Sequence, residues 1–541
     1  MSGRRYRLAL IALVALYLAQ ALYFARFLVP VSDGVQYLMI GARVVRGELG
    51  VFDDRLPGNR LPIPFYVLGV TQLGGPSLVL PRLLNIAFGV CTLLLTVALA
   101  RSLAGPRAGA LAGLFLATQG VMLAYYSYEG YPALAALSLT ATLFLLFARD
   151  SPAFRALGAT ATGLLMLVRS NLWPAVPFLL AWALWRARDV RERVALTALA
   201  VVPPLAYLAW DPTHLKILAY VPVVRRLVAR LGYDATLVLD VQERLPWRSQ
   251  LWALTHLARR YEFWVLATAL LCVLMVWRWR ARRLPPWTEP RTAVLAAFFV
   301  YLLVANFAMF SWNFKWVGLY FASFAPVLPV LLGVGFDTLL ADAPPGSWQR
   351  RALAVLVACL VVPPVYWVRN PLLPIGAVRA SDPFTAVYEA AAELRHAVPA
   401  RGRVFFYGLN TAYYLSGLPQ TYLQMLYNPD AVARPSANEQ MLRRFGMVPP
   451  DDVERWLTSD ADWAVIDVRF FDARSAAPAA AGAEPLIREM LSRHFDLVAR
   501  VERPPFFVYA IYRRKPAGAE GRRAGSASDP APGTTGTGRL R

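Results

Sequence analysis

The sequence contains little of what disulfide-bonded and zinc-binding proteins depend on. Among its 541 residues there are three Cys and four His, with no CxxC, zinc-ligand spacing or HExxH motif. A disulfide framework and a zinc site built on these motifs are therefore excluded. The cysteines, Cys91, Cys272 and Cys359, all lie in apolar runs, and we expect them to be small core residues.

Charge is also scarce, and one sign dominates it. Only 17% of the residues are charged, yet the formal net charge is +22. The basic residues come in short clusters between apolar runs, and no nucleic-acid-binding module accompanies them. We therefore expect no nucleic-acid partner, because such clusters are typical of membrane topology and of contact with anionic lipid headgroups.

Apolar residues, by contrast, are abundant. They make up 57% of the chain, the mean hydropathy is +0.43, and several runs approach the roughly 20 residues needed to cross a bilayer. The sequence predicts a multi-pass α-helical membrane protein with about 11 spans. The predicted spans are 7–28, 79–100, 108–126, 131–148, 155–169, 173–186, 194–210, 262–279, 292–310, 316–340 and 351–368.

The Arg clusters predict the orientation of these spans. Cytoplasmic loops are enriched in basic residues, which places the N-terminus, with Arg4, Arg5 and Arg7, inside the cell. An odd number of spans then puts everything after residue 369 outside. The predicted outer loop 211–261 is also basic, but long loops follow the rule weakly. The first apolar run lacks a small-residue cleavage site and is interpreted as a retained span.

Two domains and a tail are predicted. Residues 1–370 form the membrane domain, whose outer-face loops are 29–78 and 211–261, and segment 62–73 enters or skims the membrane. Residues 376–515 alternate strand-like and helix-like patterns, which predicts a small extracytoplasmic α/β domain without a dinucleotide fingerprint. Its predicted strands are 403–409, 463–468 and 507–514, and its predicted helices are 383–398 and 484–495. The tail 516–541 is predicted to be disordered.

Two acidic residues lie at the predicted outer face. Asp33, in "VSDGVQYLMIGARVVRGELG", follows the first span and opens a predicted surface helix over 33–47. Ionisable residues at membrane edges are costly and are often functional, but Ser32 or Asp33 would also serve as a helix N-cap. Glu129 lies among tyrosines in the hairpin "YYSYEGYP"; the alternative there is a solvated turn residue.

Four cations are candidate ligands of an anion at the same face. Arg60, Arg82 and Arg169 lie at predicted membrane edges, where the alternative is snorkelling to the headgroups. Lys315 is one of three Lys in a chain with 56 basic residues, which favours a need for a compact charge there. One or two carboxylates beside several cations can combine general-base chemistry with the binding of a phosphate leaving group.

These motifs resemble those of the GT-C superfamily of membrane glycosyltransferases. The resemblance is to the branch that contains protein O-mannosyltransferases and the bacterial lipid A aminoarabinose transferase. It is carried by the acidic residue and surface helix after the first span, by "GNRLPIPFYVLGV", by "PRLLNIAFGV", by "YSYEGYPAL" and by "NFKWVGLYFASFAP". The resemblance covers about residues 5 to 370 in layout and is closest over 30–150.

The resemblance implies transfer, with inversion, of a sugar from a polyprenyl phosphate to an acceptor hydroxyl at the outer face of a bacterial inner membrane. The acceptor would be a glycan, a lipid or a protein, and the membrane lipids would be partners as well. Asp33 would be the general base, and Glu129, the carboxylate of the second outer hairpin, would be a second catalytic residue. Arg60 would contact the donor phosphate. Arg82, Arg169 and Lys315 match other basic positions of the family.

The departures from the family concern a metal ion. Many relatives have an acidic pair after the first span, whereas Asp33 is followed by Gly34, and Asn59 stands where the aminoarabinose enzyme has a Glu. No metal ligand is therefore assigned, although a divalent metal is compatible with the family.

Two other functions compete with sugar transfer. A transporter or flippase of a lipid-linked saccharide would also have polar groups among apolar helices, but no convincing internal repeat supports it. An envelope scaffold would not explain Asp33 and Glu129. The polar residues gather at one face, next to the predicted α/β domain, which favours transfer chemistry.

Overall fold

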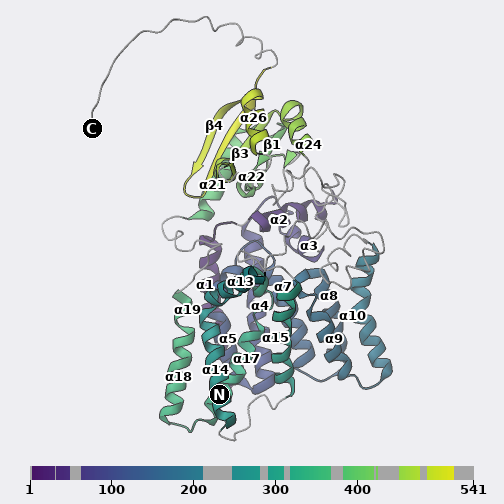
Figure 1. Ribbon diagram of the computed structural model, residues 1–541, viewed down its shortest axis with the longest axis vertical. Helices are drawn as coiled ribbons and strands as arrows, with labels where there is room; N and C mark the ends of the chain where they lie inside the picture. Colours follow the sequence, from purple (N-terminus) through teal and green to yellow (C-terminus); the bar gives the residue numbers. More distant parts are fainter. Residues whose placement is uncertain are drawn as a thin grey trace, which may run out of the picture.

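The chain forms a bundle of long helices with a small sheet domain at one end (Figure 1). This computed structural model describes residues 3–30, 32–48, 62–210, 247–280, 290–309, 317–366, 382–419, 422–423, 450–475 and 484–516. The predicted tail 516–541, apart from residue 516, lies outside them. The fold class predicted from the sequence, an α-helical membrane protein with a small C-terminal α/β unit, is confirmed.

Each predicted span coincides with a described helix of the bundle. These helices are α1 (Gly3–Phe27), α4 (Val79–Ala104), α5 (Pro106–Ala117), α7 (Pro132–Phe147), α8 (Pro152–Val168), α9 (Ala175–Trp185), α10 (Val190–Trp210), α14 (Glu262–Arg280), α15 (Pro290–Met309), α17 (Val327–Asp342) and α18 (Trp348–Val361). Two short helices extend predicted spans: α6 (Gly120–Tyr125) follows α5, and α16 (Val317–Ala322) precedes α17.

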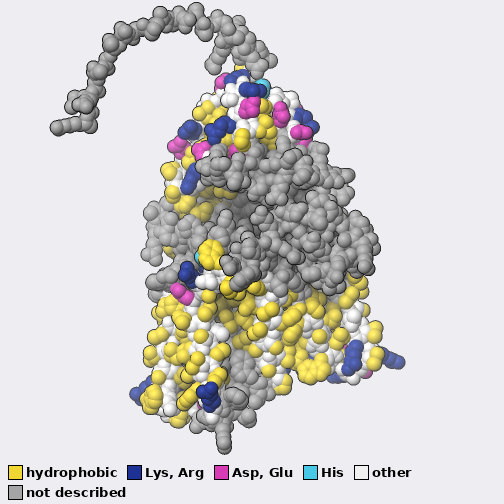
Figure 2. Space-filling view, viewed as in Figure 1, with side chains coloured by type: hydrophobic (Ala, Val, Ile, Leu, Met, Phe, Trp, Pro, Cys, Tyr) yellow, Lys and Arg dark blue, Asp and Glu magenta, His cyan; other side chains and the backbone are white. Residues whose placement is uncertain are grey.

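Four of the described helical segments are long and apolar enough to cross a membrane by themselves. They are 3–27, 79–104, 290–307 and 348–365. A fifth would result if α13 (Trp247–Arg260) and α14, which meet at a bend of 94°, formed one broken span. Figure 2 shows a broad hydrophobic surface over the bundle. The protein is therefore a multi-pass membrane protein.

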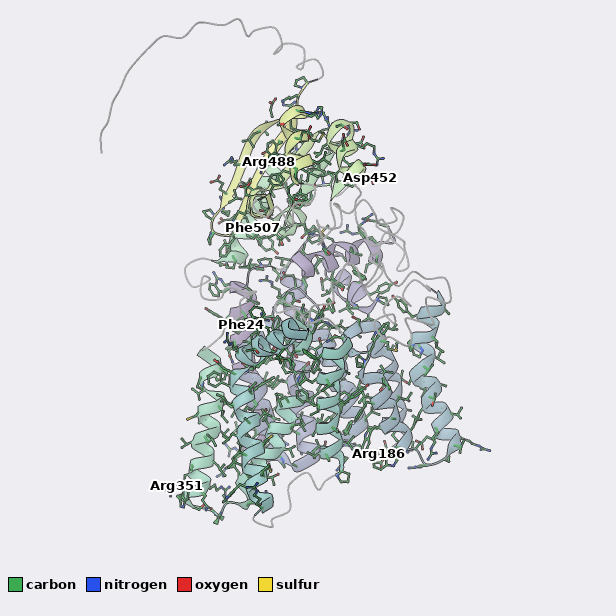
Figure 3. The ribbon with its side chains drawn as sticks, viewed as in Figure 1. Phe24, Arg186, Arg351, Asp452, Arg488 and Phe507 are labelled. Carbon is green, nitrogen blue, oxygen red and sulfur yellow. The ribbon has the colours of Figure 1, made fainter. Side chains whose placement is uncertain are left out.

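Arginines lie at the end of the bundle that is farthest from the sheet domain. The N-terminus, Arg186 and Arg351 lie at the end away from the sheet domain (Figures 1 and 3). Asp150 binds Arg186 there at 2.7 Å. Burial raises the pKa of Asp150, but hydrogen bonds from Arg186 and Arg155 outweigh this effect and lower it. We call the opposite end, nearest the sheet domain, the domain-facing end.

The three cysteines correct one expectation from the sequence. Cys91, Cys272 and Cys359 lie in α4, α14 and α18, and all three are exposed on the helix surfaces. They were expected to be buried because their surroundings in the sequence are apolar. In a membrane helix the outward face is apolar too, so hydropathy does not distinguish the core from the lipid-facing surface.

Two short helices join the bundle to the sheet domain. α2 (Ser32–Val45) and α3 (Pro62–Val70) lie between them (Figure 1) and cross at two glycines. A Cβ on Gly41 would lie 2.4 Å from the Phe65 carbonyl oxygen, and one on Gly69 would lie 2.3 Å from that of Gly41. α2 confirms the helix predicted over 33–47. α3, with nine residues, is too short to span a bilayer.

The C-terminal domain is a mixed sheet between two helical layers. Its strand order is β2-β1-β3-β5-β4, in which β2, β1 and β3 are parallel and β5 and β4 pair antiparallel. The strands are β1 (Val404–Tyr407), β2 (Tyr422–Leu423), β3 (Trp463–Asp467), β4 (Phe495–Arg503) and β5 (Phe507–Arg514). Its helices are α21 (Pro383–Ala397), α22 (Thr411–Ser416), α24 (Pro450–Arg455), α25 (Val468–Ser475) and α26 (Glu484–His494).

One core of this domain extends into the juxtamembrane helices. Val404 and Phe406 of β1 belong to the same buried cluster as Val387 of α21 and as Val35 and Leu38 of α2. Residues on the other sheet face, such as Phe405 and Tyr407, pack against α24 and α26 in a separate cluster. The sheet domain is therefore packed directly onto the helix that contains Asp33.

Candidate active site

Three of the six predicted site residues have described side chains. Glu129, Arg82 and Arg169 are buried at the domain-facing end, at 0%, 1% and 3% exposure. Their burial excludes a solvated turn for Glu129 and headgroup snorkelling for Arg82 and Arg169. Asp33 lies in the first turn of α2, but its side chain is outside what the structure describes, as are all of Arg60 and Lys315.

Glu129 and Arg82 form a buried ion pair. Arg82 Nη2 lies 2.8 Å from Glu129 Oε2, and Arg82 Nε donates to the same oxygen at 3.0 Å. Arg82 lies in the first turn of α4, and Glu129 lies in the turn between α6 and α7. A buried charge is tolerated only when it is paired and hydrogen-bonded. The pair therefore holds the hairpin against the first turn of α4.

Arg82 also binds the C-terminal end of α1. Its Nη1 donates to the Ala25 carbonyl oxygen, and its Nη2 donates to the Leu28 carbonyl oxygen at 3.3 Å. The last carbonyls of a helix lack intrahelical partners and carry partial negative charge, so a cation is favoured there. One guanidinium thus joins the end of α1, the start of α4 and the Glu129 hairpin.

Asn85 fixes the backbone of the hairpin. Its Nδ2 donates to the carbonyl oxygens of Tyr128 and Gly130, at 2.7 and 2.6 Å. Tyr126 OH donates to the Ala322 carbonyl oxygen at 2.7 Å, which ties the hairpin to the C-terminal end of α16. The backbone on both sides of Glu129 is therefore held in place.

Gly34 places the start of α2 against this hairpin. A Cβ at Gly34 would lie 2.7 Å from Glu129 Cγ and 3.0 Å from the Glu129 carbonyl carbon. Any larger side chain would therefore displace Glu129. This contact brings the start of α2, which contains Asp33, next to Glu129.

Arg169 forms a second cationic centre nearby. Its Nη1 donates to Ser323 Oγ at 2.9 Å, and its guanidinium carbon lies 4.8 Å from the ring of Tyr131 and 5.4 Å from that of Tyr320. Its Nε is buried without a hydrogen-bond partner. Within the described ranges no ion pair with a carboxylate neutralises this guanidinium. A buried cation without a counter-charge is an anion-binding candidate.

Arg260 is a site candidate that sequence reasoning missed. It is 5% exposed at the end of α13, and its Nη1 lies 3.3 Å from Tyr125 OH. It was assigned to the long outer loop as an exception to the charge pattern. Ala253, Leu257 and Arg260 are spaced i, i+4 and i+7, which places them on one face of a helix. This spacing could have indicated a buried arginine, and all three residues are buried in the structure.

No metal centre is formed by the side chains that the structure describes. Among them, no three His, Cys, Asp or Glu are close enough to hold a metal ion. The Asp33 side chain and all of Asn59 lie outside this part of the chain. The described side chains therefore provide no ligand set for the divalent metal that the family resemblance allows.

Comparisons with known proteins define the class of fold. No protein-family model matches the chain, and no curated protein matches it by sequence. The structure is similar to that of ArnT from Cupriavidus metallidurans bound to undecaprenyl phosphate, with a TM-score of 0.55, 16% identity, and coverage of 94% of this chain and 98% of that chain. The apo form of the same protein matches at 0.55 and 17% identity, over 93% and 97% of the two chains.

A second solved protein has the same architecture. The oligosaccharyltransferase of Archaeoglobus fulgidus, tethered to an acceptor peptide, matches at a TM-score of 0.53 and 12% identity, over 94% of this chain and 74% of that chain. The chain therefore has the fold of the GT-C membrane glycosyltransferases. The resemblance predicted from the motifs is confirmed at the level of the fold.

Proposed function

We propose that the protein is a glycosyltransferase that moves a sugar from a polyprenyl-phosphate donor to an acceptor hydroxyl at the extracytoplasmic face of a bacterial inner membrane. The fold carries this proposal, since it is shared over nearly the whole chain with a protein bound to undecaprenyl phosphate. The buried carboxylate and cations at the domain-facing end support it. The acceptor would be a glycan, a lipid or a protein.

The chemistry assigned to Asp33 is that of a general base. Its carboxylate takes the proton from the acceptor hydroxyl while that oxygen attacks the anomeric carbon of the sugar. The bond from the anomeric carbon to the phosphate oxygen breaks on the opposite face, so the configuration inverts. The lipid phosphate leaves with both electrons of that bond.

Cations hold the leaving phosphate in this proposal. Arg60, Lys315 and Arg169 are assigned to it, and buried Arg260 joins them because its Nη1 contacts Tyr125 OH, next to the Glu129 hairpin. Arg82 was assigned to the phosphate from its sequence position as well. Because its described contacts are with Glu129 and the end of α1, we now assign it, together with Glu129, to positioning the start of α2.

Donor binding tests the phosphate assignment. We expect Arg60→Ala and Lys315→Ala each to weaken binding of a polyprenyl-phosphate sugar by about 1.5–3 kcal/mol, the range for a charge-assisted hydrogen bond. The measurement is titration of the purified protein in detergent or nanodiscs with a fluorescent donor. Arg351→Ala, at the other end of the bundle, is the matched control and should leave affinity unchanged. Unchanged affinity in both test variants would reject the assignment.

Orientation is a separate prediction. The N-terminus and the basic end with Arg186 and Arg351 would lie in the cytoplasm, and the sheet domain outside. A reporter that works only outside the cytoplasm, fused after Pro516, is expected to be active. A fusion after Arg188, between α9 and α10 at the basic end, should be inactive. The reverse result would place the candidate site in the cytoplasm and would contradict the predicted orientation.

The competing proposal is a transporter or flippase of a lipid-linked saccharide. It would use the same cations to bind the same donor, so donor affinity alone does not separate the two functions. Transfer cleaves the donor, whereas transport leaves it intact. The geometry favours transfer, because Glu129 and the cations lie together at one end of the bundle next to the sheet domain.

A further inference from the structure

The sheet domain reaches the buried ion pair through the start of α21. Phe384, in the first turn of α21, places its ring 5.3 Å from the guanidinium carbon of Arg82. Asp382, the N-cap of α21, accepts hydrogen bonds from the backbone of Phe384 and Thr385 and forms an ion pair with Arg26 of α1 at 3.0 Å. α21 is therefore fixed to α1 at the same place where Arg82 binds the end of α1.

The charge of Asp382 is maintained by its contacts. Burial raises the pKa of its carboxyl, but hydrogen bonds from Thr385 and Arg26 outweigh burial and leave the pKa below its ordinary value. Asp382 is thus ionised near neutral pH, and the link between α21 and α1 persists there.

A second set of contacts fixes the turn that leads into α4. Tyr388, one turn further along α21, accepts a hydrogen bond from the Leu78 amide at 3.0 Å. Leu78 is the N-cap of α4, four residues before Arg82. Tyr414 of α22 donates to Gln72 Oε1 at 3.0 Å, and the same Gln72 oxygen accepts from the Ser77 amide at 2.8 Å. Hydroxyls of the sheet domain thus fix the residues that begin α4.

A third contact joins the sheet to α2. The parallel strands β1 and β3 are neighbours in the order β2-β1-β3, so the strand order reverses between them. Open α/β sheets bind ligands at the carboxyl ends of the strands at such a reversal. Here Asn410 follows β1 and its Nδ2 lies 3.3 Å from Met39 Sδ of α2. Met39 is 1% exposed and belongs to the core shared by α2 and the domain.

From these contacts we infer that Phe384 and Tyr388 are positioning residues, through which the sheet domain sets the geometry of the Arg82–Glu129 pair relative to the start of α2. The ring of Phe384 covers Arg82, and Tyr388 holds the backbone at the start of α4. This inference rests on the proposed function for its catalytic consequence. It gives the C-terminal domain a role within the site itself.

The activity test uses single substitutions in the full chain. Phe384→Leu keeps an apolar side chain but removes the ring, and we expect kcat to fall about 10²-fold, as for a small misplacement of catalytic groups. The KM for the donor should stay nearly unchanged, and Phe384→Tyr should restore kcat. Tyr388→Phe should cause a smaller loss. Tyr512→Phe, on the sheet face that packs in the other core, is the matched control and should behave like the parent.

Amide hydrogen exchange provides a readout that needs no donor. Phe384→Leu and Tyr388→Phe are expected to speed exchange in 78–85 and 126–131, while Tyr512→Phe leaves both segments unchanged. If the parent transfers sugar but both test variants keep their kcat, the inference is overturned. If the parent shows no transfer, the proposed function fails, and the inference is then decided by exchange alone: unchanged exchange in both segments would overturn it.

Discussion

Asp33→Asn is expected to leave the protein folded and able to bind a polyprenyl-phosphate sugar, while turnover falls about 10²–10⁴-fold. Asn is about as favourable as Asp at a helix N-cap, so α2 should still form. It cannot accept the proton of the acceptor hydroxyl, and the chemical step is therefore lost. The measurements are donor affinity, thermal unfolding and the initial rate of transfer on the same preparation.

The helix-stabilising role of Asp33 is separated from catalysis by this substitution. Glu48→Gln, at the other end of α2 where the side chain is 47% exposed, is the matched control and should keep full turnover. Nearly parental activity in Asp33→Asn would show that Asp33 only supports the helix. The general base would then move to Glu129, whose backbone lies against Gly34.

The second large effect concerns the buried pair. Arg82→Met leaves the carboxylate of Glu129 buried beside apolar groups, and we expect a loss of about 3–5 kcal/mol in stability. The double variant Arg82→Met/Glu129→Leu removes both charges and should recover most of that stability, because a packed apolar pair replaces a buried ion pair at little cost. Turnover should remain low in both variants, because the Arg82 guanidinium no longer joins the end of α1 to the Glu129 hairpin.

An exposed ion pair provides the comparison. Arg403 and Asp462 are 2.9 Å apart in the sheet domain, with side chains 54% and 43% exposed, and Arg403→Met should cost about 0–1 kcal/mol. Thermal unfolding in one detergent, together with the transfer rate, measures all the variants. Full activity in the double variant would contradict the positioning role of the pair.

Local patterns were enough to predict most of the elements. The apolar runs predicted the bundle helices that coincide with the predicted spans, and short runs of β-branched and aromatic residues predicted β1, β3 and β5. The strand β4 was missed because most of its side chains are exposed, so that apolar and polar positions do not alternate regularly. α13 was missed for a related reason, since its apolar face is narrow and its flanks are basic.

The site was predicted in its residue types but not in its contacts. Glu129 and Arg82 are 47 positions apart, and Asp382 is 356 positions from Arg26, so no local pattern predicts either pair. The role of Gly34 follows from the atoms of Glu129 that face it.

Cleavage of the donor is the most direct test of the central claim. The purified protein in proteoliposomes is given a polyprenyl-phosphate sugar that is labelled separately in the sugar and in the lipid phosphate, together with candidate acceptors. The account predicts that the two labels separate, with the sugar on an acceptor in inverted configuration and free polyprenyl phosphate left in the membrane, and that Asp33→Asn abolishes the separation. Movement of both labels together across the bilayer, with the donor intact, would contradict it and would identify a transporter.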